Sequence, residues 1–395
     1  MDQTDTLRRI QPCAFTAGEG TESASQTKGM VVKMVYDRNV PCFFLGANSA
    51  QGFASRFDAL YDPQSDWRAF ILKGGPGSGK STLMKSVAKS LLERGEETEL
   101  IYCSSDPVSL DAVIFPRVRF CIADGTAPHV LEPQYPGACE TLLNPGDCWD
   151  EDVLFLQRQE IFSLCEEISC QHRRARRYLN AAGSLLGENR RLALESLNAG
   201  ALEAYAGRLG RRTFPKRREQ RGTERPRFLS GFTPDGCICF WDTVSCYAKS
   251  VTAVEDEYGA AAPILLSSLR ERAIASGYDV IACYCPLFPF DKLDALIVPE
   301  MEIAFITENR FLKPKIDLTR TVHTRRFLKE NIAAHRQRIR FGRRAAAELI
   351  DEAVASLWQA RHIHDELEAI YKKAMDFNAL DRMTEALINR ISERL

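Results

Sequence analysis

Residues 74–81 have the types and spacing that bind phosphate groups. Gly74, Gly79, Lys80 and Ser81 occupy the fixed positions of the pattern G-x-x-x-x-G-K-S/T. Glycines let consecutive backbone N–H groups turn toward one anion, and a lysine at this spacing reaches the terminal phosphates. An apolar run precedes the motif and a helical pattern follows it at 82–94, which is the context that the motif requires. The stretch therefore predicts a P-loop that binds a nucleotide, ATP or GTP.

We expect the nucleotide contacts to come from the whole loop and the start of its helix. The expected contact residues are Gly74, Gly75, Pro76, Gly77, Ser78, Gly79, Lys80, Ser81 and Thr82. The Ser81 hydroxyl is expected to hold the Mg²⁺ ion that bridges the phosphates.

A second candidate ligand for Mg²⁺ ends a later strand. Within residues 118–125, an apolar strand-like run ends at Asp124. Open α/β sheets place ligands at the carboxyl ends of strands. We favour Asp124 over Asp106, which also ends a strand-like run, because a polar turn follows Asp124. His129 lies in that turn and could orient a water molecule or a substrate hydroxyl, although a loop histidine also serves as a plain hydrogen-bonding residue.

Composition points to a reduced globular protein. The chain of 395 residues has a formal charge of −1 and 13 cysteines without a framework spacing. It has no signal peptide and no apolar run long enough to cross a bilayer. We therefore expect a cytoplasmic protein without structural disulfides and without a membrane partner.

The chain divides by pattern into five parts. Residues 1–29 lack periodicity and predict a disordered extension, or a segment upstream of a later start such as Met30 or Met34, and 30–150 form the nucleotide-binding α/β half. Within that half, 31–36 predict a strand, 46–49 predict a turn that could bind substrate, and 128–150 predict a long lid-like loop. Residues 151–225 predict an antiparallel helical hairpin and a basic linker.

The hairpin and linker are rich in arginine. Runs such as Arg173, Arg174, Arg176 and Arg177 fit either a solvated surface or a phosphate footprint, so nucleic acid remains a possible partner without a recognised module to support it. An arginine from this region could also assist phosphoryl transfer, but the sequence does not choose one.

The second part of the chain repeats the first. Leu110-Asp111-Ala112-Val113-Ile114-Phe115-Pro116 corresponds to Leu293-Asp294-Ala295-Leu296-Ile297-Val298-Pro299 at an offset of 294 − 111 = 183 residues. A duplication is the economical explanation. The equivalent of the P-loop, residues 256–262, has acids and no lysine, and Thr307 falls opposite Asp124. We expect no triphosphate to bind there.

These patterns predict a duplicated α/β protein with a P-loop NTPase fold, in which a helical hairpin follows each half. Residues 226–320 are the degenerate half, and 321–395 are a C-terminal helical segment with patterns at 323–341, 343–377 and 379–395.

The motifs of the first half resemble a poorly characterised family of bacterial P-loop ATPases built from two similar halves. The resemblance is carried by residues 74–85, by Cys103-Ser104-Ser105-Asp106 and by Asp124-Gly125-Thr126-Ala127-Pro128-His129. It implies an ATP-binding protein of the cytosol and offers no settled substrate. Because the second P-loop is lost here, a mechanism that needs two competent sites is in doubt.

Three functions fit the sequence. The leading one is an NTPase that hydrolyses ATP to drive a conformational change on a protein partner, reached through the helical hairpins. The second is a kinase for a small molecule or nucleotide, and the third is a nucleotide-sensing module without catalysis.

Overall fold

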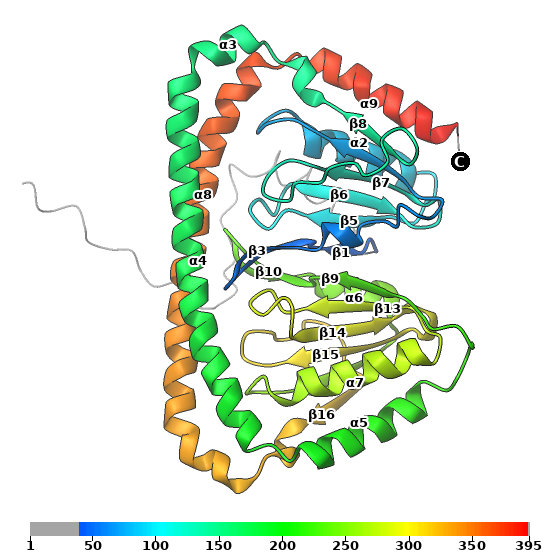
Figure 1. The fold of residues 1–395 in the computed structure, drawn as a ribbon, viewed down its shortest axis with the longest axis vertical. Coiled ribbons are helices and arrows are strands. Elements are labelled where there is room, and N and C mark those ends of the chain that lie inside the picture. Colours follow the sequence, from blue (N-terminus) through cyan, green and yellow to red (C-terminus); the bar gives the residue numbers. More distant parts are fainter. Residues whose placement is uncertain (1–38, 394–395) are drawn as a thin grey trace, which may run out of the picture. The chain divides into compact units, whose positions relative to one another are not determined.

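The computed structural model describes residues 39–393, which belong to one compact unit. The expected extension at 1–29 and the expected strand at 31–36 lie outside the described residues. The protein is a mixed α/β structure with two six-stranded sheets (Figure 1).

The first sheet is built by the first half of the chain. In spatial order its strands are β1 (Cys42–Phe43), β5 (Glu99–Tyr102), β6 (Leu110–Phe115), β7 (Phe120–Asp124), β4 (Arg68–Leu72) and β8 (Glu140–Leu143). Strand β4 pairs in parallel with β7 and β8, whereas β6 is antiparallel to β5 and β7. The carboxyl ends of β4, β5 and β7 and the amino end of β6 therefore meet at one edge.

The second sheet has the same strand order. Its strands are β9 (Glu224–Arg227), β13 (Val280–Tyr284), β14 (Leu293–Val298), β15 (Ile303–Glu308), β12 (Ser250–Glu255) and β16 (Arg320–His323). The parallel and antiparallel pairs also correspond. Arg119 and Glu302, at φ 50° and 52°, adopt the left-handed conformation before β7 and β15, at the same offset of 302 − 119 = 183. This agreement is what a duplication predicts.

Each sheet has an accessory hairpin and a helix on one face. The hairpins are β2 (Gly46–Ser49) with β3 (Gly52–Ser55) and β10 (Ser230–Thr233) with β11 (Gly236–Cys239). The helices are α2 (Lys80–Leu92) and α7 (Ala261–Ala275), with the short helix α6 (Trp241–Tyr247) in the second half. Strands β6 and β14 are buried along their whole length, which explains their near-continuous apolar sequences.

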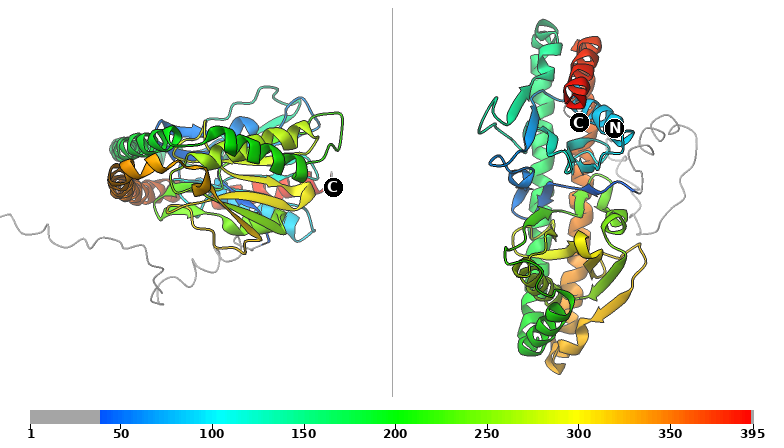
Figure 2. Two further views of the ribbon diagram at one scale, coloured as in Figure 1. Left: turned by 90° about the horizontal axis from the view of Figure 1, so that it is seen from below. Right: turned by 90° about the vertical axis from the view of Figure 1, so that its right-hand side faces the viewer.

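The expected helical hairpins are wrong in their pairing. After the short α3 (Glu151–Leu156), helix α4 (Arg158–Glu195) packs along α8 (Arg336–Ala374), and the two lie side by side next to both sheets (Figures 1 and 2). Helix α5 (Ala199–Thr213) packs on α7, and α9 (Phe377–Ser392) packs on α2. Periodicity identifies a buried stripe but not its partner. The pattern expected at 343–377 lies mostly in this helix α8, whereas most of the pattern expected at 323–341 forms the 3₁₀ helices η4 (Thr324–Phe327) and η5 (Glu330–His335).

The expected turn at 46–49 is wrong, and the expected loop at 128–150 is interrupted by regular elements. Residues 46–49 form strand β2 rather than a turn, and Asn48 Nδ2 donates to Phe232 O of the second half at 3.0 Å. The region 128–150 contains β8 and the 3₁₀ helix η2 (Pro145–Cys148). Strand β8 has only four residues and lies at the sheet edge, so its pattern is too short to stand out among prolines and glycines.

The two sheets meet at one edge of each. Phe44 N donates to Phe228 O at 2.9 Å, and Phe228 N donates to Phe44 O at 2.9 Å. These residues follow β1 and β9, which are equivalent strands, so the reciprocal pair is arranged as a local two-fold axis would arrange it. The linker arginines also join the halves, because Arg225 lies 2.6 Å and Arg227 3.3 Å from Glu99 on β5.

Candidate functional site

The glycine-rich loop at 73–79 connects β4 to α2. Gly77 and Gly79 adopt φ values of 68° and 77°, which L side chains rarely adopt. A Cβ on Gly74 would lie 2.8 Å from Ser78 Oγ, which itself donates to Gly75 O at 2.8 Å. The loop therefore needs glycine at several positions, as the motif predicts.

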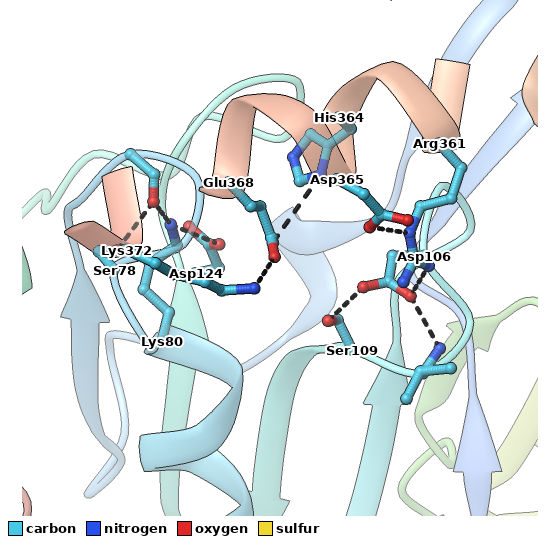
Figure 3. Close-up of polar contacts among 12 residues, drawn as sticks. Ser78, Lys80, Asp106, Ser109, Asp124, Arg361, His364, Asp365, Glu368 and Lys372 are labelled. Atoms are coloured by element: carbon cyan, nitrogen blue, oxygen red, sulfur yellow. Dashed lines mark hydrogen bonds and ion pairs between the residues drawn. The ribbon is translucent and has the colours of Figure 1, made fainter. Parts of the chain in front are cut away.

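The C-terminal helices cover this loop. A Cβ on Gly77 would lie 2.9 Å from the backbone oxygen of Glu368 in α8, and one on Gly79 would lie 2.3 Å from Leu380 Cδ2 in α9. Backbone hydrogen bonds also join the end of α8 to the segment after η2. Asp376 N donates to Cys148 O at 2.7 Å, and Asp150 N donates to Ala374 O at 2.8 Å. Figure 3 shows α8 passing over the site.

Lys80 lies close to Ser78 and Asp124 (Figure 3). Its Nζ donates to Gly74 O at 2.5 Å and to Gly75 O at 2.8 Å, and lies 3.5 Å from Asp124 Oδ2. The start of α2 thus brings Lys80 next to Asp124 at the end of β7.

Asp124 and Ser81 supply oxygen atoms of the types that Mg²⁺ binds. Asp124 Oδ1 accepts from Thr126 N at 2.9 Å and from Thr126 Oγ1 at 2.6 Å, while Oδ2 faces Lys80. Ser81 Oγ accepts from Leu110 N at 3.0 Å, which fixes the hydroxyl at the start of β6. One carboxylate and one hydroxyl suit Mg²⁺, which keeps several waters and takes its other ligands from phosphates. Thr82, by contrast, is exposed.

Asp106, the alternative carboxylate, has other partners. It accepts from Ser109 Oγ at 2.5 Å and Val108 N at 3.1 Å, and it forms an ion pair with Arg361 of α8. Arg361 Nε also lies 3.0 Å from Asp365 Oδ1. Asp106 therefore anchors α8 to the edge of the site.

Sequence reasoning missed the residues that α8 brings to the site. Besides Arg361 and Asp365, they include Glu368 and Lys372, which pair with each other at 2.5 Å, and His364, which lies 3.8 Å from Glu368 (Figure 3). Burial lowers the pKa of His364, an effect that Glu368 opposes. More than 200 residues separate these side chains from the loop, so no local signal could have placed them there.

Two further buried groups lie beyond Asp124. Asp111 on β6 is buried, and burial, with Asp124 adding to it, raises the pKa of its carboxyl to about 6, although His129 acts in the opposite sense. His129 Nε2 lies 3.9 Å from Asp111 Oδ1. His129 was a sequence candidate, whereas Asp111 was noted only as part of the repeat.

The equivalent loop of the second half holds its own anion. Asp256, between β12 and α7, accepts from Tyr258 N at 3.2 Å, Gly259 N at 3.1 Å and Ala262 N at 2.7 Å. The N–H groups at the start of α7 thus converge on a side-chain carboxylate. Nearby, the buried Lys292 pairs with Asp294, the counterpart of Asp111, at 2.5 Å.

Comparison with known proteins yields one partial match. The family model described as "Nephrocystin 3, N-terminal" matches residues 54–112, a segment that contains β4, the glycine-rich loop, α2 and β5. Neither the curated proteins nor the solved structures contain a match.

Two general properties complete the description of the site and its surroundings. Within residues 39–393, His, Cys, Asp and Glu side chains do not gather in threes or more in an arrangement that could hold a metal ion. The helices of the same residues include none with the length and apolar character that a membrane span needs.

Proposed function

We propose that the first half binds Mg-ATP at the glycine-rich loop and hydrolyses it, and that the whole chain is a duplicated P-loop NTPase. The observation that carries this proposal is the position of Lys80, which lies between the loop carbonyls and Asp124 at the N-terminus of α2. The match of residues 54–112 to a family model spans the same loop.

Each residue has a defined role in this proposal. The backbone N–H groups of the loop and the N-terminus of α2 hold the phosphates. Lys80 leaves the carbonyls of Gly74 and Gly75 and neutralises the terminal phosphate. Ser81 and Asp124 would hold Mg²⁺, which when bound neutralises charge on the phosphates.

Helices α8 and α9 supply the conformational response. Both lie against the loop at Gly77 and Gly79, so a nucleotide that reorganises the loop also changes their packing. Because α8 begins beside the second half and ends over the first site, it is the element that carries this change between the halves.

The kinase alternative has less support. Of the residues considered for its acceptor site and lid, 46–49 form strand β2, and the lid region 128–150 is interrupted by strand β8 and helix η2. A nucleotide sensor uses the same site without turnover and is separated from a hydrolase by the measurement below.

The test is phosphate release from ATP with and without magnesium. We expect release without any added acceptor for the wild type and none for Lys80→Ala. Lys89→Ala is the matched control, because Lys89 is exposed on the same helix and forms an ion pair with Glu93, at 3.9 Å. Release that requires an acceptor would indicate a kinase. Binding without release in either case would indicate a sensor.

A further inference from the structure

We propose that His129 contacts the water that attacks the terminal phosphate, with Asp111 as its positioning residue. The inference rests on the proposed function, because it assigns a catalytic group to the same site. His129 and Asp111 lie outside the glycine-rich loop. Neither of them is an expected magnesium ligand.

His129 has unsatisfied hydrogen-bonding capacity. Its exposed fraction is only 5%, and neither ring nitrogen has a hydrogen-bond partner within residues 39–393. Leaving a buried polar group without a partner destabilises the fold, so native proteins rarely tolerate it without a reason. A water molecule at the phosphate would supply the missing partner.

The position of His129 is continuous with the lysine site. Ala112 on β6 pairs with Ala123 on β7, so Asp111 and Asp124 are neighbours across the two strands. Asp124 Oδ2 lies 3.5 Å from Lys80 Nζ, and Asp111 Oδ1 lies 3.9 Å from His129 Nε2. Lysine, two carboxylates and histidine therefore follow one another along the ligand-binding edge.

The imidazole is held in a fixed orientation. Its ring stacks on Phe57 with centroids 4.5 Å apart and planes 7° apart, and Phe53 lies 6.1 Å away. Asp111 faces one nitrogen, which leaves the other for the water. The stacked ring and the facing carboxylate thus orient the imidazole.

The step balances within the site. As the water oxygen bonds to the terminal phosphorus, the free nitrogen of His129 takes a proton from that water. The bond from phosphorus to the bridging oxygen breaks, and its electron pair stays on the ADP that leaves. Asp111 stabilises the resulting imidazolium.

The second half provides an internal comparison. It keeps the carboxylate as Asp294, but this residue pairs with Lys292, and Thr307 replaces Asp124. Residues 309–319, which follow β15 as the His129 turn follows β7, contain no histidine. At the offset of 183 residues, the buried Leu312 takes the place of His129. The histidine occurs only with the loop that carries the lysine.

The experiment compares His129→Ala and Asp111→Asn with wild type for ATP binding, ATP turnover and thermal unfolding. We expect His129→Ala to lower kcat by about 100-fold with ATP affinity unchanged. Asp111→Asn should give a smaller loss of kcat. The control is Asp294→Asn, the same change in the second half, which should lower stability but leave kcat per folded molecule unchanged.

The outcomes separate this inference from the proposed function. Turnover by His129→Ala at the wild-type rate would overturn the inference alone. The inference would also be overturned if His129→Ala lost turnover only to the extent that it lost ATP binding or folded protein. Wild-type protein that binds ATP without releasing phosphate would overturn both the inference and hydrolysis, while failure of the wild type to bind ATP would overturn nucleotide binding itself.

Discussion

Single residues decide what each of the two equivalent loops can hold. In the first loop Lys80 rests on carbonyl oxygens of the loop, and in the second the Asp256 carboxylate receives three backbone N–H groups. Backbone amides at a helix N-terminus favour an anion. In the second loop the Asp256 carboxylate already accepts these N–H groups, so they are not available to bind a phosphate.

Asp256→Ala should destabilise the protein. The change removes the shared acceptor of Tyr258 N, Gly259 N and Ala262 N, and hydrogen bonds to a charged group contribute about 1.5–3 kcal/mol each before relaxation. We expect the free energy of unfolding to fall by about 2–4 kcal/mol in urea titrations. Asp256→Asn keeps an acceptor and should cost less. An Asp256→Ala protein as stable as wild type would contradict the role of the carboxylate.

At this scale the sequence predicts the residues of a local motif well. Glycines at 77 and 79, Lys80 and Asp124 could be identified because loop, helix and strand end follow one another in the chain. Arg361 could not, since its position depends on how a 39-residue helix packs. Asp111 could not be identified as a site residue either, because it lies in a completely buried strand whose other residues are mostly apolar.

Helix α8 is the element that links the first site to the rest of the protein. Its length of 39 residues corresponds to about 58 Å at 1.5 Å per residue. Ala346, Ile350, Ala353 and Leu357 pack with Ala175, Leu179 and Ala182 of α4, and farther along the helix Arg361 reaches Asp106. The amphipathic pattern predicted the helix, but nothing local predicted that α4 rather than a neighbour would be its partner.

Arg361→Ala should loosen α8 from the first half. The arginine side chain is 27% exposed and pairs with Asp106 and Asp365, so we expect a loss of about 1–2 kcal/mol in unfolding free energy. Amide hydrogen exchange should rise near the end of α8. The matched control is Arg344→Ala on the same helix, whose exposed pair with Glu348 spans 4.0 Å and should contribute less than about 0.5 kcal/mol. Equal effects of the two changes would argue against the anchor.

The molecule as a whole is joined at the edges of its two sheets. Besides the Phe44–Phe228 pair, Thr243 Oγ1 donates to Cys42 O at 2.8 Å and accepts from Cys42 N at 2.8 Å. Glu99 of the first half, which is 2% exposed, contacts Arg225, Arg227 and the Tyr247 hydroxyl of the second. Sequence repetition predicts two similar halves, but it contains no information about which edges meet.

Glu99 should make stability fall in acid. Burial alone would raise its pKa, but Arg225 and Arg227 more than offset this and hold the pKa below its usual range. A lowered folded pKa contributes stability that is complete above the unfolded value of about 4.3 and is lost as pH falls through the folded value.

Glu99→Gln tests this contribution. It should cost about 3 kcal/mol at neutral pH, because it leaves the buried Arg227 without its carboxylate, and the difference from wild type should shrink as pH falls below about 4. Unfolding curves across pH measure it, with Glu93→Gln as an exposed control. A difference independent of pH would show that the charge of Glu99 is not involved.

The central claim is that the half of the chain with the glycine-rich loop holds a nucleotide. Calorimetric titration of the purified protein with Mg-ATP tests it most directly, because it reports both affinity and the number of sites. We predict one site per chain, lost in Lys80→Ala and retained in Lys89→Ala. No binding by the wild type, or binding that Lys80→Ala leaves intact, would contradict the account.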